Sequence, residues 1–165
     1  MKTLWKIVGG ILVCLVLVLL VLRVIGLNPH GDTPGPGSYP GLWLNGNLVT
    51  TPVADWSFTG KVQTVKVQTN TWYLIPHSVT TWCIAYNGQL YLATSGATVR
   101  QWPLNVARDP HVRLKIAGQL YDRTLVVVTD PAEREAVLQL RAKKYSQKYP
   151  PPAGVTFTVY HVMPD

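Results

Sequence analysis

Residues 80–95 read TTWCIAYNGQLYLATS and contain the strongest local structural signal in the chain. Two runs rich in β-branched and aromatic residues flank the pair Asn87-Gly88. Such residues fit a pleated, half-buried surface, and Asn-Gly favours a two-residue turn with positive φ at both positions. The sequence therefore predicts a tight β-hairpin here.

Downstream of the hairpin, an irregular stretch containing Pro103 and Pro110 leads into further strands. Residues 111–116 alternate strictly, with Val112, Leu114 and Ile116 on one face and the polar residues on the other. After a turn at Ala117-Gly118, a long strand is expected over residues 119–129, and residues 155–162 (VTFTVYHV) alternate again as a closing strand.

One amphipathic helix is expected between these last two strands. Asp130 can cap its N-terminus, Pro131 suits the first helical position, and Glu133 can reach back to complete a capping box. Apolar residues then recur at helical spacing until the run of prolines that begins at Pro150.

Upstream of the hairpin, residues 61–68 (KVQTVKVQ) and residues 71–75 are predicted to be strands. Residues 42–53 contain Asn45-Gly46 between short apolar runs, which is typical of either a small hairpin or a wrapping loop. Six or so mostly antiparallel strands and one late helix predict a mainly β fold, a small antiparallel barrel over residues 42–165. Closing the sheet removes exposed edges.

The N-terminal region predicts a membrane anchor over residues 1–27. Residues 7–25 are apolar or glycine except for Arg23, and as a helix they would span roughly 28 Å, close to the thickness of the hydrocarbon core. A cleavable signal peptide is the alternative, but the small-x-small cleavage site is missing and the apolar run is long. We therefore expect an uncleaved single span with the lipid bilayer as its partner.

The charges that flank this span predict its orientation. Lys2 and Lys6 precede it, whereas after Arg23 no Lys or Arg occurs until Lys61. The N-terminus is therefore expected in the cytoplasm and the C-terminal domain outside it. Residues 28–41 (NPHGDTPGPGSYPG) have no periodic apolar face and predict a disordered tether.

Composition excludes several classes of protein. Residues 28–165 carry 12 Lys and Arg against 8 Asp and Glu, a net charge of +4, and the cations are scattered, so we expect no nucleic-acid binding. Cys14 lies in the apolar run and Cys83 in a strand, so no disulfide follows. We find no metal-ligand spacing, nucleophile elbow or phosphate-binding glycine loop, and His30 and His161 are too isolated to form a metal site.

One pattern extends from the end of the hairpin to the helix start. A basic residue, Arg100, is followed by Asn-x-x-x-Asp-Pro-x-Val at 105–112, then by the turn at Gly118 and the helix start at 130–133. This order resembles the pyridoxamine-phosphate-oxidase-like split β-barrels, which include flavin- and deazaflavin-dependent reductases. The resemblance covers Lys61 to Tyr149 and implies a small antiparallel split β-barrel.

The resemblance also implies a cofactor, FMN or a deazaflavin. In such barrels, polar and basic residues at the end of the second hairpin strand and on the following strands hold the cofactor phosphate, and the preceding strand lines the ring. A flavin needs charge-assisted donors for its phosphate and a wall for its ring. The corresponding residues are Thr94, Ser95, Arg100, Arg113 and Lys115 for the phosphate, and Ser78, Thr80 and Trp82 for the ring.

Two hypotheses follow from the resemblance. In the first, the chain is a membrane-anchored barrel that binds a flavin-type cofactor and is a candidate oxidoreductase for small molecules, with its catalytic residues unknown. In the second, it is a non-catalytic binding or assembly module at the membrane surface, because residues 98–102 hold one cation, Arg100, beside the bulky Trp102, and the domain is expected outside the cytoplasm. A homodimer is expected under both.

For several residues, the sequence is compatible with two roles. Arg100 suits an anion ligand or a solvated loop cation, and the His111, Arg113 and Lys115 face suits a phosphate site or a plain charged strand surface. His77 suits an acid or base near neutral pH or a capped loop residue. The aromatic residues from Trp72 to Trp102 suit a ring pocket or the core of a small barrel.

Overall fold

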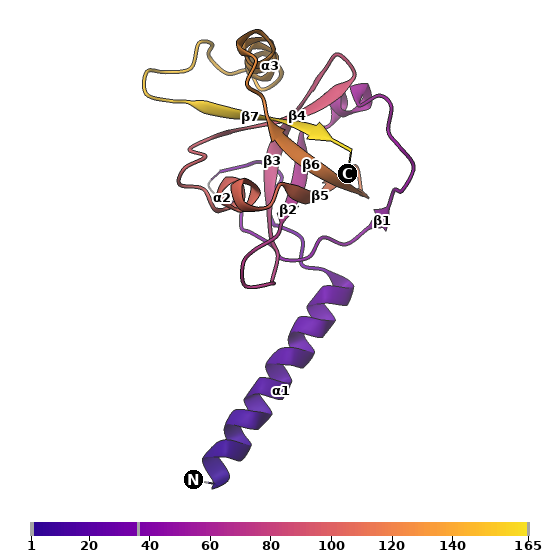
Figure 1. The fold of residues 1–165 in the computed structure, drawn as a ribbon, viewed down its shortest axis with the longest axis vertical. Helices are drawn as coiled ribbons and strands as arrows, with labels where there is room; N and C mark the ends of the chain where they lie inside the picture. Colours follow the sequence, from indigo (N-terminus) through magenta and orange to yellow (C-terminus); the bar gives the residue numbers. More distant parts are fainter. Residues whose placement is uncertain (1, 36, 165) are drawn as a thin grey trace.

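The computed structural model describes residues 2–35 and 37–164. Its first element is the helix α1 (Lys2–Ile25), which projects from one end of a β-rich body (Figure 1). None of its residues is buried, and its most apolar window has a mean hydropathy of 3.0. The helix is thus long and apolar enough to cross a membrane, a test that a signal sequence near the N-terminus also meets.

The body is a closed antiparallel barrel, as the sequence predicts. Six strands close it in the order β2-β3-β4-β7-β6-β5 and back to β2, and the short β1 is added in parallel to β6. The strands are β1 (Asn47–Leu48), β2 (Thr64–Thr69), β3 (His77–Tyr86), β4 (Gln89–Ser95), β5 (His111–Ile116), β6 (Gln119–Val127) and β7 (Phe157–Met163).

The predicted hairpin is confirmed as β3 and β4. Asn87 and Gly88 have φ of 49° and 74°, the left-handed values that this turn requires. The two strands pair only from Cys83–Tyr86 to Gln89–Leu92, and beyond this the first half of β3 pairs with β2 while the end of β4 pairs with β7. The barrel therefore splits between β3 and β4.

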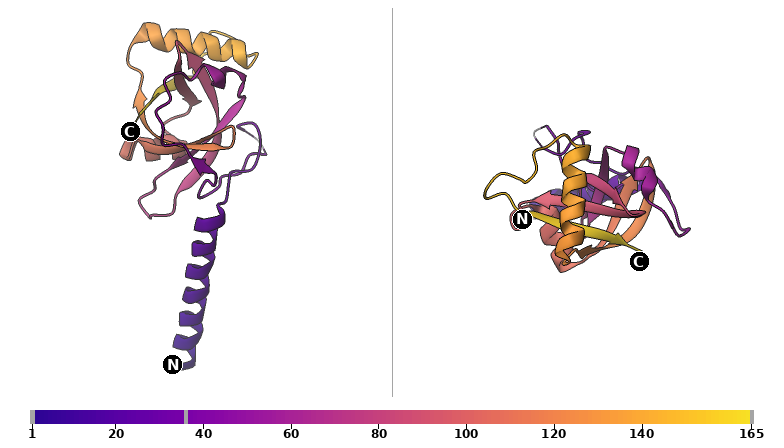
Figure 2. Two further views of the ribbon diagram at one scale, coloured as in Figure 1. Left: turned by 90° about the vertical axis from the view of Figure 1, so that its right-hand side faces the viewer. Right: turned by 90° about the horizontal axis from the view of Figure 1, so that it is seen from above.

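Alternation along the strands places the core. Inward residues of all six strands, with Trp56, Trp102 and Val106, form the barrel interior. A second cluster lies outside the barrel, where α3 (Pro131–Lys144) packs across β3 and β7 through Val137 and Leu138. Figure 2 shows α3 at the end of the barrel opposite to α1.

The start of α3 confirms part of the predicted cap. The Asp130 carboxylate accepts hydrogen bonds from the amides of Ala132 and Glu133, at 3.4 and 3.0 Å. The Glu133 side chain does not turn back toward the cap. It accepts a 2.5 Å hydrogen bond from the Tyr91 hydroxyl, because β4 passes beside the helix.

Two local predictions are wrong. The stretch expected to be irregular contains a helix, α2 (Gln101–Arg108), since Pro103 lies in the first turn, where an amide has no partner within the helix. Residues 71–75, expected to be a strand, form the turn between β2 and β3, where Thr71 Oγ1 donates to the Ile75 carbonyl at 2.6 Å. A short 3-10 helix, η1 (Ser57–Lys61), was not predicted.

Described residues of the Pro/Gly-rich segment, 28–35 and 37–41, make backbone contacts with each other and with the barrel. His30 and Tyr39 pair across it, and Gly41 pairs with Ser78 on β3. Residues 42–53 wrap around the barrel and contribute β1, which decides between the two readings in favour of the wrapping loop. The chain therefore contacts the outside of the barrel both at Gly41 and at β1.

Candidate functional site

Polar side chains form two rows across the outside of three strands, β3, β2 and β5. Register places Lys66 beside Thr80 and Lys115, and Gln68 beside Ser78 and Arg113. We call the six residues Lys66, Gln68, Ser78, Thr80, Arg113 and Lys115 the outer polar face. It contains four of the residues predicted as cofactor ligands, Ser78, Thr80, Arg113 and Lys115.

The two ammonium groups on this face are held by neutral oxygen atoms. Lys66 Nζ donates to the Pro29 carbonyl at 2.9 Å, and Lys115 Nζ donates to Oδ1 of Asn45 at 3.0 Å and of Asn28 at 3.3 Å. Burial and the neighbouring Lys66 lower the pKa of Lys115. In the described part of the chain, neither lysine has a carboxylate at ion-pair distance, so the pair remains an uncompensated positive charge.

Arg113 differs from the lysines because its charge is compensated. Its Nε and Nη2 donate to the two oxygens of Asp122 on β6, at 2.6 and 2.8 Å, and this pairing raises the pKa of Arg113. A fork of this kind is strong and directional. Because Asp122 neutralises the guanidinium, Arg113 adds no net positive charge to the face.

The chain covers this face with its own segment. We call residues 27–35 and 37–45 the cover, because Thr80 Oγ1 donates to the Gly31 carbonyl at 3.0 Å and Ser78 exchanges two backbone hydrogen bonds with Gly41. At Gly41 an added Cβ would lie 2.2 Å from the Leu27 carbonyl oxygen, so this approach requires glycine. The cover thus occupies the space in front of the lysine pair.

Two buried polar atoms at the start of β3 have no hydrogen-bond partner. They are Ser78 Oγ, on a fully buried residue, and His77 Nδ1. Burial lowers the pKa of His77, which favours the neutral imidazole. Buried polar atoms without partners are rare, so Ser78 Oγ marks a donor or acceptor that is free for a ligand beneath the cover.

The other predicted ligands lie away from this face. Trp82 stacks on Tyr145 and lies 4.6 Å from the guanidinium of Arg141, at the side of the barrel that α3 covers. Thr94 and Ser95 lie at the end of β4, and Arg100 Nε donates to the Ser95 carbonyl at 2.9 Å. Arg100 precedes α2 and is exposed, so the structure separates these residues into three groups.

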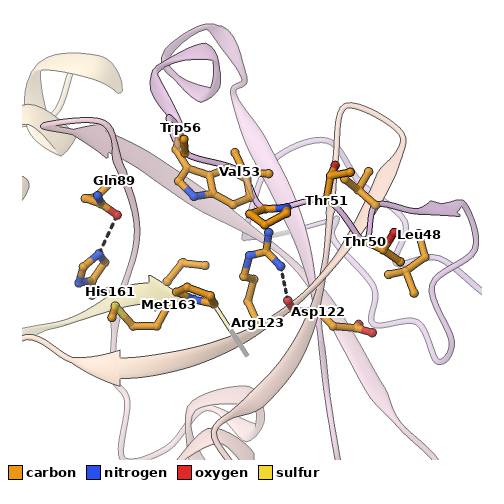
Figure 3. Close-up of a pocket in the computed structure, with 15 residues that line it drawn as sticks. Leu48, Thr50, Thr51, Val53, Trp56, Gln89, Asp122, Arg123, His161 and Met163 are labelled. Atoms are coloured by element: carbon orange, nitrogen blue, oxygen red, sulfur yellow. Dashed lines mark hydrogen bonds between the residues drawn. The ribbon is translucent and has the colours of Figure 1, made fainter.

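The largest cavity described lies elsewhere on the barrel (Figure 3). It has a volume of about 710 Å³ and lies between residues 48–56, β6 and the end of β7. Arg123 extends over the ring of Trp56 at 5.3 Å, and His161 faces Gln89. None of the predicted ligands lines this cavity.

Comparison with known proteins identifies the fold. A protein from Listeria innocua assigned as a pyridoxamine 5′-phosphate oxidase matches 66% of this chain and 89% of its own, with a TM-score of 0.51 and 16% identity. An F420 reductase matches 70% and 96%, with a TM-score of 0.50 and 18% identity. This chain has the split-barrel fold.

A third split barrel matches a larger share of this chain. A protein from Bacteroides thetaiotaomicron assigned to 5-nitroimidazole antibiotic resistance covers 83% of this chain and 86% of its own, with a TM-score of 0.53 and 12% identity. No family model and no curated protein matches the sequence. The likeness therefore lies in the split barrel itself, as the resemblance of residues 61–149 predicts.

The outer polar face fits the phosphate end of a flavin-type cofactor in chemistry, whereas the cover restricts the room. Two uncompensated ammonium groups, the Thr80 hydroxyl and the free Ser78 Oγ are suitable partners for a phosphate. In the structure, oxygens of residues 28–45 occupy the lysine donors. A phosphate would take the place of these oxygens.

Sequence reasoning missed two members of this face, Lys66 and Gln68. The alternation of KVQTVKVQ already places them opposite the inward Val65 and Val67. Knowing that β2 lies between β3 and β5 would have assigned both residues to the site. That order of strands is a property of the closed barrel and has no local signature.

Proposed function

We propose that this protein is a membrane-anchored split barrel that binds a flavin-type cofactor, FMN or a deazaflavin, through its phosphate on the outer polar face. The lysine pair carries the proposal, because Lys66 and Lys115 lie side by side and no carboxylate of the described residues pairs with either. Adjacent like charges repel, and an anion between them removes this cost.

Each residue of the outer polar face would have its own role in binding the phosphate. Lys66 and Lys115 would donate to the phosphate, and Thr80 and Ser78 would orient it. A bound flavin or deazaflavin would supply redox chemistry, which would make the protein an oxidoreductase that acts on small molecules. The anchor would be α1, with its N-terminus in the cytoplasm and the barrel outside, as the flanking charges indicate.

The test is a titration of the full-length chain in lipid nanodiscs with FMN and with a deazaflavin, followed by cofactor fluorescence. Lys66→Met and Lys115→Met should each weaken binding about tenfold or more, because a charged hydrogen bond contributes roughly 1.5–3 kcal/mol. Lys61→Met is the matched control, since Lys61 is exposed in η1, away from the face. Equal loss in the control variant would contradict the assignment of the phosphate to this face.

A second candidate function has its own support in the cover. Six hydrogen bonds described above join residues 28–45 to the outer polar face, and a barrel closed in this way suits a non-catalytic binding or assembly module. Asn45→Ala would loosen the cover, because Asn45 bonds Asn28, Lys115 and the Ile25 carbonyl.

The same titration separates the two candidates. Binding by the unmodified chain supports the cofactor protein, and absence of binding by both the unmodified chain and Asn45→Ala supports the non-catalytic module. Binding by Asn45→Ala alone would show that the cover restricts access to a functional site. The homodimer that the resemblance implies remains a proposal under either candidate, and light scattering on the nanodisc-free protein in detergent would test it.

A further inference from the structure

The turn between β2 and β3 exposes a cluster of large apolar side chains. We call residues 70–76 (NTWYLIP) the aromatic loop. Trp72 is 77% exposed, Tyr73 46% and Leu74 89%, and the rings of Trp72 and Tyr73 pack edge to face at 5.4 Å. Exposed apolar patches of this kind mark surfaces that contact a partner or a membrane.

Hydrogen bonds hold this loop in one shape. Arg108 Nη2 donates to the Asn70 carbonyl, and Asn70 Nδ2 donates to Asp109 Oδ2 at 2.8 Å, so the end of α2 supports the loop from behind. Thr71 Oγ1 closes the turn onto the Ile75 carbonyl. The apolar side chains are therefore presented by a rigid support.

Leu74 has a backbone conformation that is unfavourable for leucine. Its φ is 65°, in the left-handed region where glycine is preferred and a leucine is strained. The side chain gains almost no burial within the protein in return. Strain of this kind at a loop tip points to a role outside the fold.

The aromatic loop lies at the end of the barrel from which α1 leaves. Both Figure 1 and the left view of Figure 2 show the β2–β3 connection extending toward the helix, with α3 at the far end. Arg23, in the last turn of α1, lines one cavity of about 500 Å³ together with Trp72, Leu74 and Arg108. The loop tip is thus at the level where the apolar run of α1 ends.

We infer that the aromatic loop inserts into the head-group region of the membrane leaflet from which α1 emerges, so that the barrel contacts the bilayer at a second point. This inference rests on the proposed membrane anchor. Trp and Tyr favour this interfacial layer, and leucine favours the acyl chains just below it. Arg23 and Arg108 border the cavity beside the loop, where lipid phosphates would lie, with Asp109 as the acidic group facing them.

The experiment places a fluorescent reporter in the loop of the full-length chain. In a Cys14→Ala background, Tyr73→Cys carries a polarity-sensitive label, and the buried Cys83 is protected from labelling. Val155→Cys, on an exposed residue of the loop that precedes β7 at the α3 end, is the matched control. The protein is inserted into phosphatidylcholine vesicles with or without lipids spin-labelled near the head group.

We expect a blue-shifted emission at position 73 and roughly twofold or greater quenching relative to position 155, because only position 73 lies in the interface. Trp72→Ser or Leu74→Gly in the labelled protein should return the emission toward that of position 155. Leu74→Gly relieves the backbone strain, so the unfolding temperature of this variant should not be lowered. The variant therefore separates a loss of membrane contact from a loss of folding.

Three results would overturn the inference in different ways. If alkaline carbonate extracts the unlabelled chain from the vesicles, α1 is not an anchor and the proposed function fails with it. If the chain resists extraction but position 73 behaves like position 155, the anchor stands and the loop inference is wrong. Insertion that persists in both loop variants would show that the label itself drives the contact.

Discussion

Gly41 is the residue at which the cover comes closest to its own chain. An added Cβ would approach the Leu27 oxygen and the nitrogen of Pro29 at 2.2 and 2.5 Å, and these are backbone atoms that cannot rotate away. At the same position the amide and carbonyl of Gly41 bond to Ser78. One small residue therefore allows the chain at Gly41 to lie against both residues 27–29 and Ser78 of β3.

Gly41→Ala should detach the cover from the barrel. We expect a loss of about 1–3 kcal/mol in the free energy of unfolding, the usual range for inserting a group into a packed site, measured by urea denaturation in detergent. Gly60→Ala is the control, because a Cβ at Gly60 meets nothing within 4 Å. Equal stability of the two variants would contradict the packing of the cover.

At the scale of single elements, local signals predicted most of what formed. The Asn87-Gly88 turn and the Asp130 cap act within a few residues of themselves, so the sequence reveals them. The helix α2 was not predicted because proline is typical of irregular chain. Here Pro103 lies in the first turn of the helix and Pro110 lies beyond its end. Residues 71–75 have a composition typical of strands, but they form a turn because they connect the antiparallel strands β2 and β3.

The cap of α3 provides a test at this scale. Asp130→Ala removes the acceptor of the Ala132 and Glu133 amides and should lower the free energy of unfolding by about 1 kcal/mol. Asp130→Asn keeps an acceptor and should recover most of this loss in the same urea titration. If Asp130→Asn is as unstable as Asp130→Ala, the charge and not the hydrogen bond stabilises this end.

For the whole molecule, alternation predicted the inside of the barrel, but the outer polar face required knowledge of the closed strand order. The resemblance named Arg113 and Lys115 as ligands, and the alternation of β5 places them on one face. Lys66 was missed although β2 alternates equally well. The cover was unpredictable for a further reason. Its contacts join backbone carbonyls and amide side chains to distant strands, and these contacts follow no sequence period.

Hydrogen exchange on the full-length chain in nanodiscs tests this arrangement. The amides of Tyr39, Gly41 and Leu42 donate to His30, Ser78 and Leu27 and should exchange slowly. Peptides that cover residues 97–98, at the start of the β4–α2 connection, should exchange quickly and serve as the reference. Fast exchange at 39–42 would restore the disordered tether that the sequence predicts.

The bond from Asn45 Nδ2 to the Ile25 carbonyl, 2.7 Å long, joins the wrapping loop to the last residue of α1. A free linker of 14 residues would let the barrel explore roughly 20 Å around its point of attachment. Because Gly41 bonds to β3 and Asn45 bonds to the end of α1, the barrel loses this freedom to move around its point of attachment. With α1 as the proposed anchor, the barrel would move together with its helix at a constant height. Any ligand or partner would then have to reach it by lateral diffusion in the membrane or by arrival at the bilayer surface.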